Sequence, residues 1–175
     1  MKNKQLRKSF ARLVFMAVLF FSVQSIRAEN KAGLFPVIEP SRGISGAALG
    51  MSIKKALPLF GSLKPVASGV DDQYEGQIVY YYFFLNKDKD NNYGLEIYTD
   101  KKKKIFMFVI NSPSFMTKEG IKVGSAEAEL VKAFGKQLKR KKQGDIYIKY
   151  SLGGKKGTDF YVKDGVVTQI IVRDY

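Results

Sequence analysis

The sequence contains no cysteine and no histidine. The lack of cysteine excludes disulfide bonds, thiol nucleophiles and a lipid attached to a cysteine side chain. The lack of histidine removes the most common general base, and together the two absences remove the usual ligands of transition metals. The chain also shows no nucleophile elbow and no phosphate-binding loop. We therefore predict a protein that is not an enzyme and that uses no cofactor and no metal.

The first 28 residues have the composition of a secretory signal peptide. A basic segment that ends at Arg12 precedes an apolar run from Leu13 to Val23, and Ala28 offers a small residue at the expected cleavage position. The apolar run is shorter than the roughly 20 residues that span a membrane, which argues against a retained anchor. We expect a periplasmic or secreted mature chain with no membrane span after cleavage.

The chain has few acidic residues for its number of basic ones. Its formal net charge is +14, and removal of the six basic residues within 1–28 leaves +8. Such a charge favours solubility, and it also attracts acidic proteins, acidic polysaccharides and phosphorylated lipids. Nucleic acid is not an expected partner, because an exported chain without a recognisable binding motif is a poor candidate for it.

Three short blocks of sequence occur twice and in the same order. The matched pairs are 50–61 with 124–135, 76–82 with 144–150, and 94–98 with 157–161. The first pair begins and ends with glycines at identical spacing, and the third pair ends in tyrosine in both copies. Blocks repeated in the same order predict a duplicated structural unit.

Each copy predicts one helix followed by three strands. The helices are expected over Ser52–Phe60 and Ser125–Phe134, since a serine can cap each one and a glycine follows each apolar stripe. The expected strands are Gln77–Leu85, Gly94–Thr99 and Ile105–Ile110, and then Asp145–Leu152, Thr158–Val162 and Val166–Val172. The expected fold class is therefore α+β: two tandem repeats, each a short helix packed on a three-stranded antiparallel meander.

The domain organisation follows from these elements. We expect a signal peptide over 1–28, an irregular lead-in over 29–46, a first repeat over 47–111 and a second repeat over 112–175. The lead-in is rich in glycine, proline and serine, which favours irregular backbone or a short edge strand.

Alternation along the strands assigns residues to two sheet faces. Leu95 and Ile97 are expected to face the helix, which leaves Glu96 and Tyr98 on the other face. The matching strand of the second copy repeats this acid-plus-tyrosine pattern. Candidate residues for binding another protein on that face are Tyr81, Phe83, Glu96, Tyr98, Met107, Asp159 and Tyr161. For Tyr81 and Phe83, packing between the repeats is the competing interpretation.

Two basic clusters offer an alternative kind of site. The anion-binding candidates are Lys101, Lys102, Lys103 and Lys104 in one cluster, and Lys139, Arg140, Lys141 and Lys142 in the other. If both lay on one edge, they would attract anionic glycan or lipid phosphate, and added salt would weaken that attraction. Two ordinary solvated segments are the competing interpretation.

The sequence resembles a known small repeat at four places. Gly50-Met51-Ser52, Phe60-Gly61, Gly124-Ser125 and Phe134-Gly135 are similar to the repeat of outer-membrane assembly lipoproteins of the SmpA/BamE type. Two such units in tandem resemble the layout of the secreted β-lactamase inhibitory protein. The chain departs from both, because it has neither the acylated cysteine of the first nor the disulfides of the second. The resemblance implies that the open sheet face docks another protein.

Together these observations predict an exported, non-catalytic module that docks a partner protein of the bacterial envelope or secretome on its open sheet face. Two alternatives remain open. The first is an electrostatic binder of anionic glycan or lipid that uses the lysine clusters. The second is an inhibitor of a secreted enzyme, which differs from the main prediction only in its target.

Overall fold

The computed structural model describes residues 37–61, 65, 67–71, 78–83 and 94–174, and for 67, 70, 71 and 78–83 it describes the backbone alone. The expected signal peptide and the first part of the expected lead-in lie outside the described residues. The rest of that lead-in contains two short strands, β1 (Val37–Glu39) and β2 (Gly43–Ile44).

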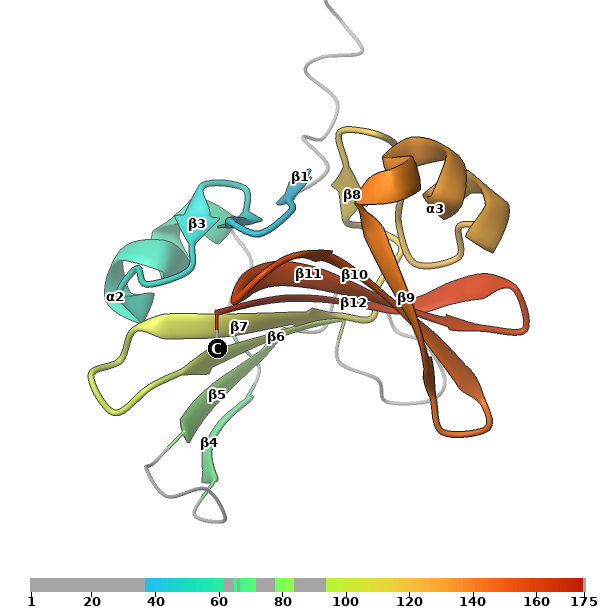
Figure 1. The fold of residues 1–175 in the computed structure, drawn as a ribbon. Helices are drawn as coiled ribbons and strands as arrows, with labels where there is room; N and C mark the ends of the chain where they lie inside the picture. Colours follow the sequence, from blue (N-terminus) through green and yellow to red (C-terminus); the bar gives the residue numbers. More distant parts are fainter. Residues whose placement is uncertain (1–36, 62–64, 66, 72–77, 84–93, 175) are drawn as a thin grey trace, which may run out of the picture. The chain divides into compact units, whose positions relative to one another are not determined.

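The main element is an antiparallel sheet of eight described strands (Figure 1). The strands are β4 (Ala67–Asp71), β5 (Ile78–Phe83), β6 (Leu95–Thr99), β7 (Ile105–Ile110), β9 (Leu138–Gln143), β10 (Tyr147–Gly153), β11 (Lys156–Lys163) and β12 (Val166–Asp174). Their order is β4-β5-β6-β7-β12-β11-β10-β9. Two four-stranded meanders are therefore joined edge to edge where β7 pairs with β12, and Ile110 lies opposite Ile170 there.

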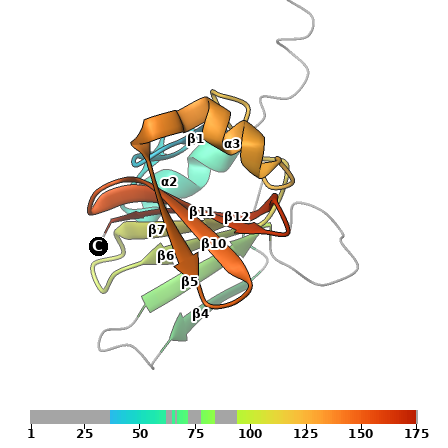
Figure 2. The ribbon, with the colours of Figure 1, turned by 45° about the vertical axis from the view of Figure 1, so that its right-hand side comes forward.

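A second, smaller sheet and the helices lie together on one face of the large sheet (Figures 1 and 2). The small sheet has the order β3-β2-β1-β8, in which β3 is Ala47–Ala48 and β8 is Met116–Thr117. Helix α2 (Ile53–Ala56) continues as a 3-10 helix over Leu57–Phe60. Helix α3 (Glu127–Phe134) continues as a 3-10 helix over Gly135–Gln137. Among the described elements, the helices and the small sheet therefore cover one face of the large sheet and leave the other face without a helix.

The helix boundaries follow from local chemistry. Pro58 lies in the 3-10 segment after α2, because proline has no N–H to continue an α-helical ladder. Ser125 does not cap α3; its hydroxyl accepts a hydrogen bond from the N–H of Lys122 at 3.2 Å. The Glu129 carboxylate instead accepts the N–H of Ala126 at 3.0 Å, which satisfies a backbone donor at the helix start.

The expected fold class, two tandem helix-plus-three-strand repeats, is wrong. The described chain is mostly β, and its α-helices have four and eight residues. Each half contributes four strands to the large sheet, and the two halves share one continuous sheet rather than forming two separate layers. The additional strands β4 and β9 lie at the two edges of the sheet. An edge strand has one paired neighbour and needs no apolar alternation, so neither was recognisable as a strand from the sequence.

The two halves also share one core. Ile53 and Phe60 from the first half belong to the same buried cluster as Leu130 and Phe134 from the second. The ring of Phe134 packs on the fully buried Phe160 of β11, with ring centroids 5.5 Å apart. Burial of these side chains between the helices and the sheet is the main favourable contribution to folding.

Tyr150 links the edge of the sheet to helix α3. Its hydroxyl donates a hydrogen bond to Oε1 of Glu127 and accepts one from Nε of Arg140 at 3.1 Å. Burial raises the pKa of the Tyr150 phenol above its ordinary value of 10.0. The bond to Glu127 adds to this rise in pKa, and the bond to Arg140 opposes it. The hydrogen bond from Tyr150 to Glu127 therefore requires that the Tyr150 phenol is protonated.

Replacement of Tyr150 with phenylalanine is expected to remove a pH-dependent part of the stability. Because the folded-state pKa lies above the unfolded-state value, the hydroxyl contributes fully below about pH 10 and loses its contribution as pH rises through the folded-state pKa. The difference in free energy of unfolding between wild type and Tyr150→Phe should therefore shrink above about pH 10. Urea unfolding of both proteins at a series of pH values measures this difference in free energy. A difference that grows with pH would contradict the raised pKa of Tyr150.

Candidate functional site on the far face of the sheet

The face of the large sheet opposite the helices, which we call the far face, carries polar and aromatic side chains. Directly paired residues share a face, and Leu95 and Ile97 of β6 are fully buried on the helix side, so their neighbours Glu96 and Tyr98 lie on the far face. The same alternation gives the described members of this face as Glu96, Tyr98, Met107, Val109, Asn111, Lys139, Lys141, Tyr147, Lys149, Ser151, Asp159, Tyr161, Gln169, Ile171 and Arg173.

The far face contains a hollow of about 510 Å³ that is open to solvent. Its lining residues are Asn111, Tyr147, Tyr161, Thr168 and Gln169. They come from β10, β11, β12 and the residue after β7, so the hollow crosses the junction between the two meanders. Two phenols, two amides and a hydroxyl among these described residues offer both ring surface and hydrogen-bonding groups to a ligand.

A chain of hydrogen bonds holds part of this lining in place. The Nε2 group of Gln169 donates to Oδ1 of Asn111 at 2.9 Å, and Nδ2 of Asn111 donates to Oε1 of Glu96 at 3.3 Å. The hydroxyl of Tyr98 donates to Oε2 of Glu96 at 2.6 Å. Both oxygens of Glu96 are therefore used, and the side chains keep a fixed arrangement before any ligand arrives.

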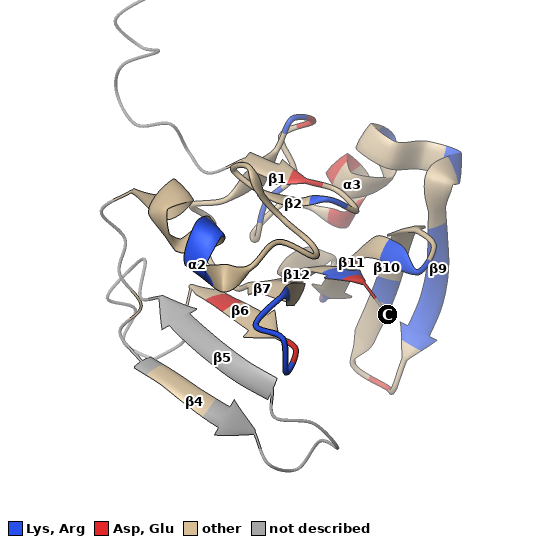
Figure 3. Cartoon of the chain, turned by 90° about the vertical axis from the view of Figure 1, so that its left-hand side faces the viewer, with Lys and Arg blue, Asp and Glu red and all other residues tan. Residues whose placement is uncertain are grey.

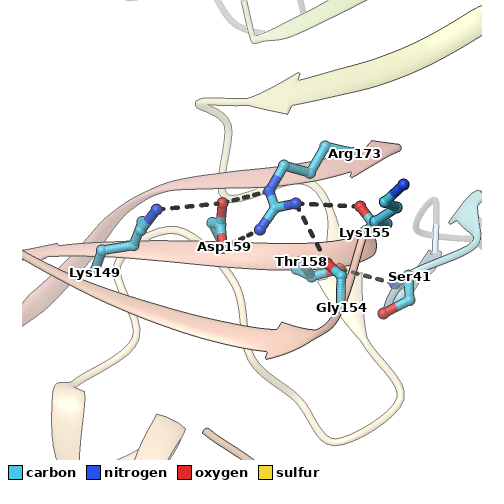
Figure 4. Close-up of polar contacts among 7 residues, drawn as sticks. All are labelled: Ser41, Lys149, Gly154, Lys155, Thr158, Asp159 and Arg173. Atoms are coloured by element: carbon cyan, nitrogen blue, oxygen red, sulfur yellow. Dashed lines mark hydrogen bonds and ion pairs between the residues drawn. The ribbon is translucent and has the colours of Figure 1, made fainter. Parts of the chain in front are cut away.

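Asp159 lies beside the hollow, at the centre of a buried ionic cluster (Figure 4). Its side chain is 4% exposed and accepts two hydrogen bonds from Arg173, from Nε at 2.6 Å and from Nη2 at 3.2 Å. The Nζ of Lys149 lies 3.9 Å from the same carboxylate. Arg173 also donates to the carbonyl oxygens of Gly154 at 3.4 Å and Lys155 at 3.2 Å, in the turn between β10 and β11. The cluster fixes that hairpin on the sheet.

The structure separates the candidate protein-binding residues into groups. Glu96, Tyr98 and Met107 lie together on β6 and β7, and Met107 lies directly opposite Tyr98. Asp159 and Tyr161 lie on β11, with β12 between them and β7. Tyr161 lines the hollow, whereas Asp159 is engaged by Arg173 and Lys149 and acts as a structural group.

Tyr81 and Phe83 lie on β5, where only the backbone is described. Tyr81 is paired with Ile97 and Phe83 with Leu95, and both of these partners are fully buried. The side chains of Tyr81 and Phe83 lie outside the described part of the structure, so their expected role stays a prediction.

Four lining residues were not among the sequence candidates: Asn111, Tyr147, Thr168 and Gln169. A signal existed for Tyr147 and Gln169, because alternation along their strands points both away from the helices. Asn111 lies just after β7, and 58 residues separate it from its hydrogen-bond partner Gln169. Only the pairing of β7 with β12 brings those two side chains together.

The two basic clusters do not form one surface. Lys101 to Lys104 are exposed in the turn between β6 and β7, and the cluster from Lys139 to Lys142 lies on the edge strand β9 (Figure 3). Strands β12, β11 and β10 separate β7 from β9. Within the second cluster Arg140 bonds Tyr150, and Lys142 lies 3.6 Å from Asp145. Charged side chains on an edge strand also hinder pairing with other chains.

Two further findings concern the described part of the chain. No helix there is long and apolar enough to cross a membrane. No group of three acidic side chains there is placed to hold a metal ion.

Comparisons with known proteins define the fold and nothing beyond it. No protein-family model matches the chain, and no curated protein matches it. Among solved structures, the chain is similar to the crystal structure of the uncharacterized protein YfeY from Escherichia coli. The TM-score is 0.52 at 14% sequence identity, over 76% of this chain and 97% of that one. This likeness shows a shared fold, and the resemblance to the SmpA/BamE-type repeat and to the β-lactamase inhibitory protein stays a prediction.

Proposed function

We propose that this chain is an exported, non-catalytic module that binds a partner protein of the bacterial envelope or secretome on its far face. Export rests on the composition of residues 1–28. Binding rests on one observation, the hollow lined by Tyr147, Tyr161, Thr168, Asn111 and Gln169. Tyrosine is a favoured anchor of protein interfaces, because it combines a large ring with a polar tip and loses little conformational entropy.

The hydrogen bonds among the side chains that line the hollow support recognition of a partner protein. The hydrogen bonds from Gln169 to Asn111 and from Asn111 to Glu96 fix two amide groups before binding, so a partner would lose less free energy in ordering them. Tyr147 is 38% exposed, which leaves its ring available at the edge of the hollow. The separation of the two lysine clusters supports this choice over a continuous anionic-polymer surface.

Truncation of the two tyrosines is expected to reduce partner capture by about tenfold or more, because interface anchors commonly contribute 1–2 kcal/mol or more each. The test is a pull-down from native envelope and culture fluid with the tagged mature chain. Wild type is compared with the double variant Tyr147→Ala, Tyr161→Ala at high salt, and captured proteins are quantified against bait.

The matched control is Leu59→Ala. Leu59 is 46% exposed on the 3-10 helix that follows α2, on the other side of the sheet. This variant removes a similarly exposed apolar side chain and should capture the partner as wild type does. Thermal unfolding must show that all the variants stay folded. Equal capture by wild type, the double variant and the control would contradict the proposal.

A further inference from the structure

The far face carries a row of paired residues that runs across the strands. Lys141 lies directly opposite Lys149, Lys149 opposite Tyr161, and Tyr161 opposite Gln169. Gln169 then hydrogen-bonds Asn111, which hydrogen-bonds Glu96 on β6. The row therefore begins with two cations on β9 and β10, passes the hollow and ends at a carboxylate.

At the cationic end, the described residues supply less negative charge than Lys141 and Lys149 supply positive charge. Lys141 and Lys149 are like charges placed directly opposite each other, an arrangement that is destabilising in a sheet. Asp159 lies 3.9 Å from Lys149, but it already accepts two hydrogen bonds from Arg173. Lys141 is exposed, and no carboxylate of the described residues lies within ion-pair distance of it. An anionic group from a ligand would relieve this repulsion.

The opposite end of the row has the reverse polarity. Glu96 is held there by the hydroxyl of Tyr98 and the amide of Asn111. A carboxylate fixed in this way repels negative charge and attracts hydrogen-bond donors or a cation. The described residues that line the hollow between the two ends are all uncharged. A fitting ligand carries negative charge at one end and donors at the other.

We propose that the partner contacts this row with an extended peptide segment that is acidic at one end. Its carboxylates lie at Lys141 and Lys149, an uncharged side chain enters the hollow, and donor groups reach Glu96. This inference rests on the proposed function and specifies the partner's chemistry. Five strand spacings of about 4.8 Å separate β9 from β6, so about seven or eight extended residues span the row.

The polarity of the row favours a peptide over an acidic glycan. An acidic glycan repeats its negative charge along the whole chain and would place charge against Glu96. A peptide can confine its acidic residues to one end, so it can satisfy Lys141, Lys149 and Glu96 at once. The expected order of affinity is therefore a polarised peptide above a uniformly anionic ligand.

The test uses defined probes and site-resolved detection. The ¹⁵N-labelled mature chain is titrated with an octapeptide of two glutamates, four serines and two lysines in that order. Parallel titrations use an all-glutamate octapeptide and a hyaluronan oligosaccharide, and two-dimensional NMR reports amide shifts. The polarised peptide should shift amides of Lys149, Tyr161 and Gln169 and bind most tightly of the three. Its affinity should fall as salt is added.

The deciding variants are Lys141→Glu and Lys142→Glu, which have the same change in charge on adjacent residues. Lys141 lies on the far face opposite Lys149, whereas Lys142 lies opposite Ile148 on the helix side. Lys141→Glu should weaken the polarised peptide by about fivefold or more, and Lys142→Glu by less than about twofold. Equal weakening, tighter binding of either uniform polyanion, or no shift along the row at millimolar peptide overturns the inference.

The two proposals fail in different ways. If capture of an envelope protein depends on Tyr147 but not on Lys141, the docking function stands and the acidic partner segment is wrong. If capture is insensitive to the tyrosine variants, the docking function itself is wrong, whatever the octapeptides do.

Discussion

Replacement of Asp159 with alanine is expected to lower the free energy of unfolding by about 3–5 kcal/mol, because it leaves two partly buried cations without their counter-charge. The Arg173 side chain is 13% exposed, and its two hydrogen bonds to Asp159 would both be lost. Lys149, which is 23% exposed, would lose its neighbouring carboxylate as well. Chemical denaturation followed by circular dichroism measures the change.

The control for this prediction is Asp145→Ala. Asp145 pairs with Lys142 at 3.6 Å, but its side chain is fully exposed, and exposed ion pairs contribute little. Its replacement should leave the free energy of unfolding nearly unchanged. If Asp159→Ala costs no more than Asp145→Ala does, the cluster around Arg173 does not stabilise the sheet.

The next residue along the chain, Phe160, is expected to show an effect of similar size from the opposite face. Its ring is fully buried against Phe134, so Phe160→Ala removes a core side chain and leaves a cavity. The expected loss is about 3–5 kcal/mol. At about 2–4 °C per kcal/mol for a chain of this size, the melting temperature should fall by roughly 6–20 °C. Differential scanning calorimetry measures both quantities.

Val131→Ala serves as the comparison for Phe160→Ala. Val131 lies on α3 but is 43% exposed, and alanine is the better helix former. Its replacement should leave the melting temperature nearly unchanged. If Phe160→Ala melts like Val131→Ala, the helix–sheet core is not the main source of stability.

Local pattern was enough to find many of the strands but not their arrangement. The alternation of β6 predicts that Leu95 and Ile97 point to the core, and both are fully buried. The edge strand β9 is almost entirely basic and polar, so its sequence does not show the alternation of apolar and polar residues that marks a strand. The pairing of β7 with β12 joins residues about 60 positions apart. Nothing in the sequence of either strand identifies the strand with which it pairs. Strand edges pair through backbone groups, which every residue carries.

The same limit applies to the candidate site. Tyr161 and Glu96 could be placed on the far face because each lies between two core residues of its strand. The contact between Asn111 and Gln169 required knowledge of the junction between the two meanders, since 58 positions separate these residues along the chain. The buried ionic role of Asp159 was also beyond the pattern, because it depends on Arg173 in the neighbouring strand β12.

The junction of the two meanders also sets the order in which the molecule can be completed. Strand β12 follows the other described strands along the chain, so the edge of β7 is covered by a strand that is made well after β7 itself. Until it arrives, β7 presents the sequence Ile-Phe-Met-Phe-Val-Ile with an open hydrogen-bonding edge. An uncharged segment of this kind is a template for self-association. Closure of such a long-range contact is the slow step in sheet proteins, so aggregation through the open edge of β7 is expected to compete with folding during synthesis and refolding.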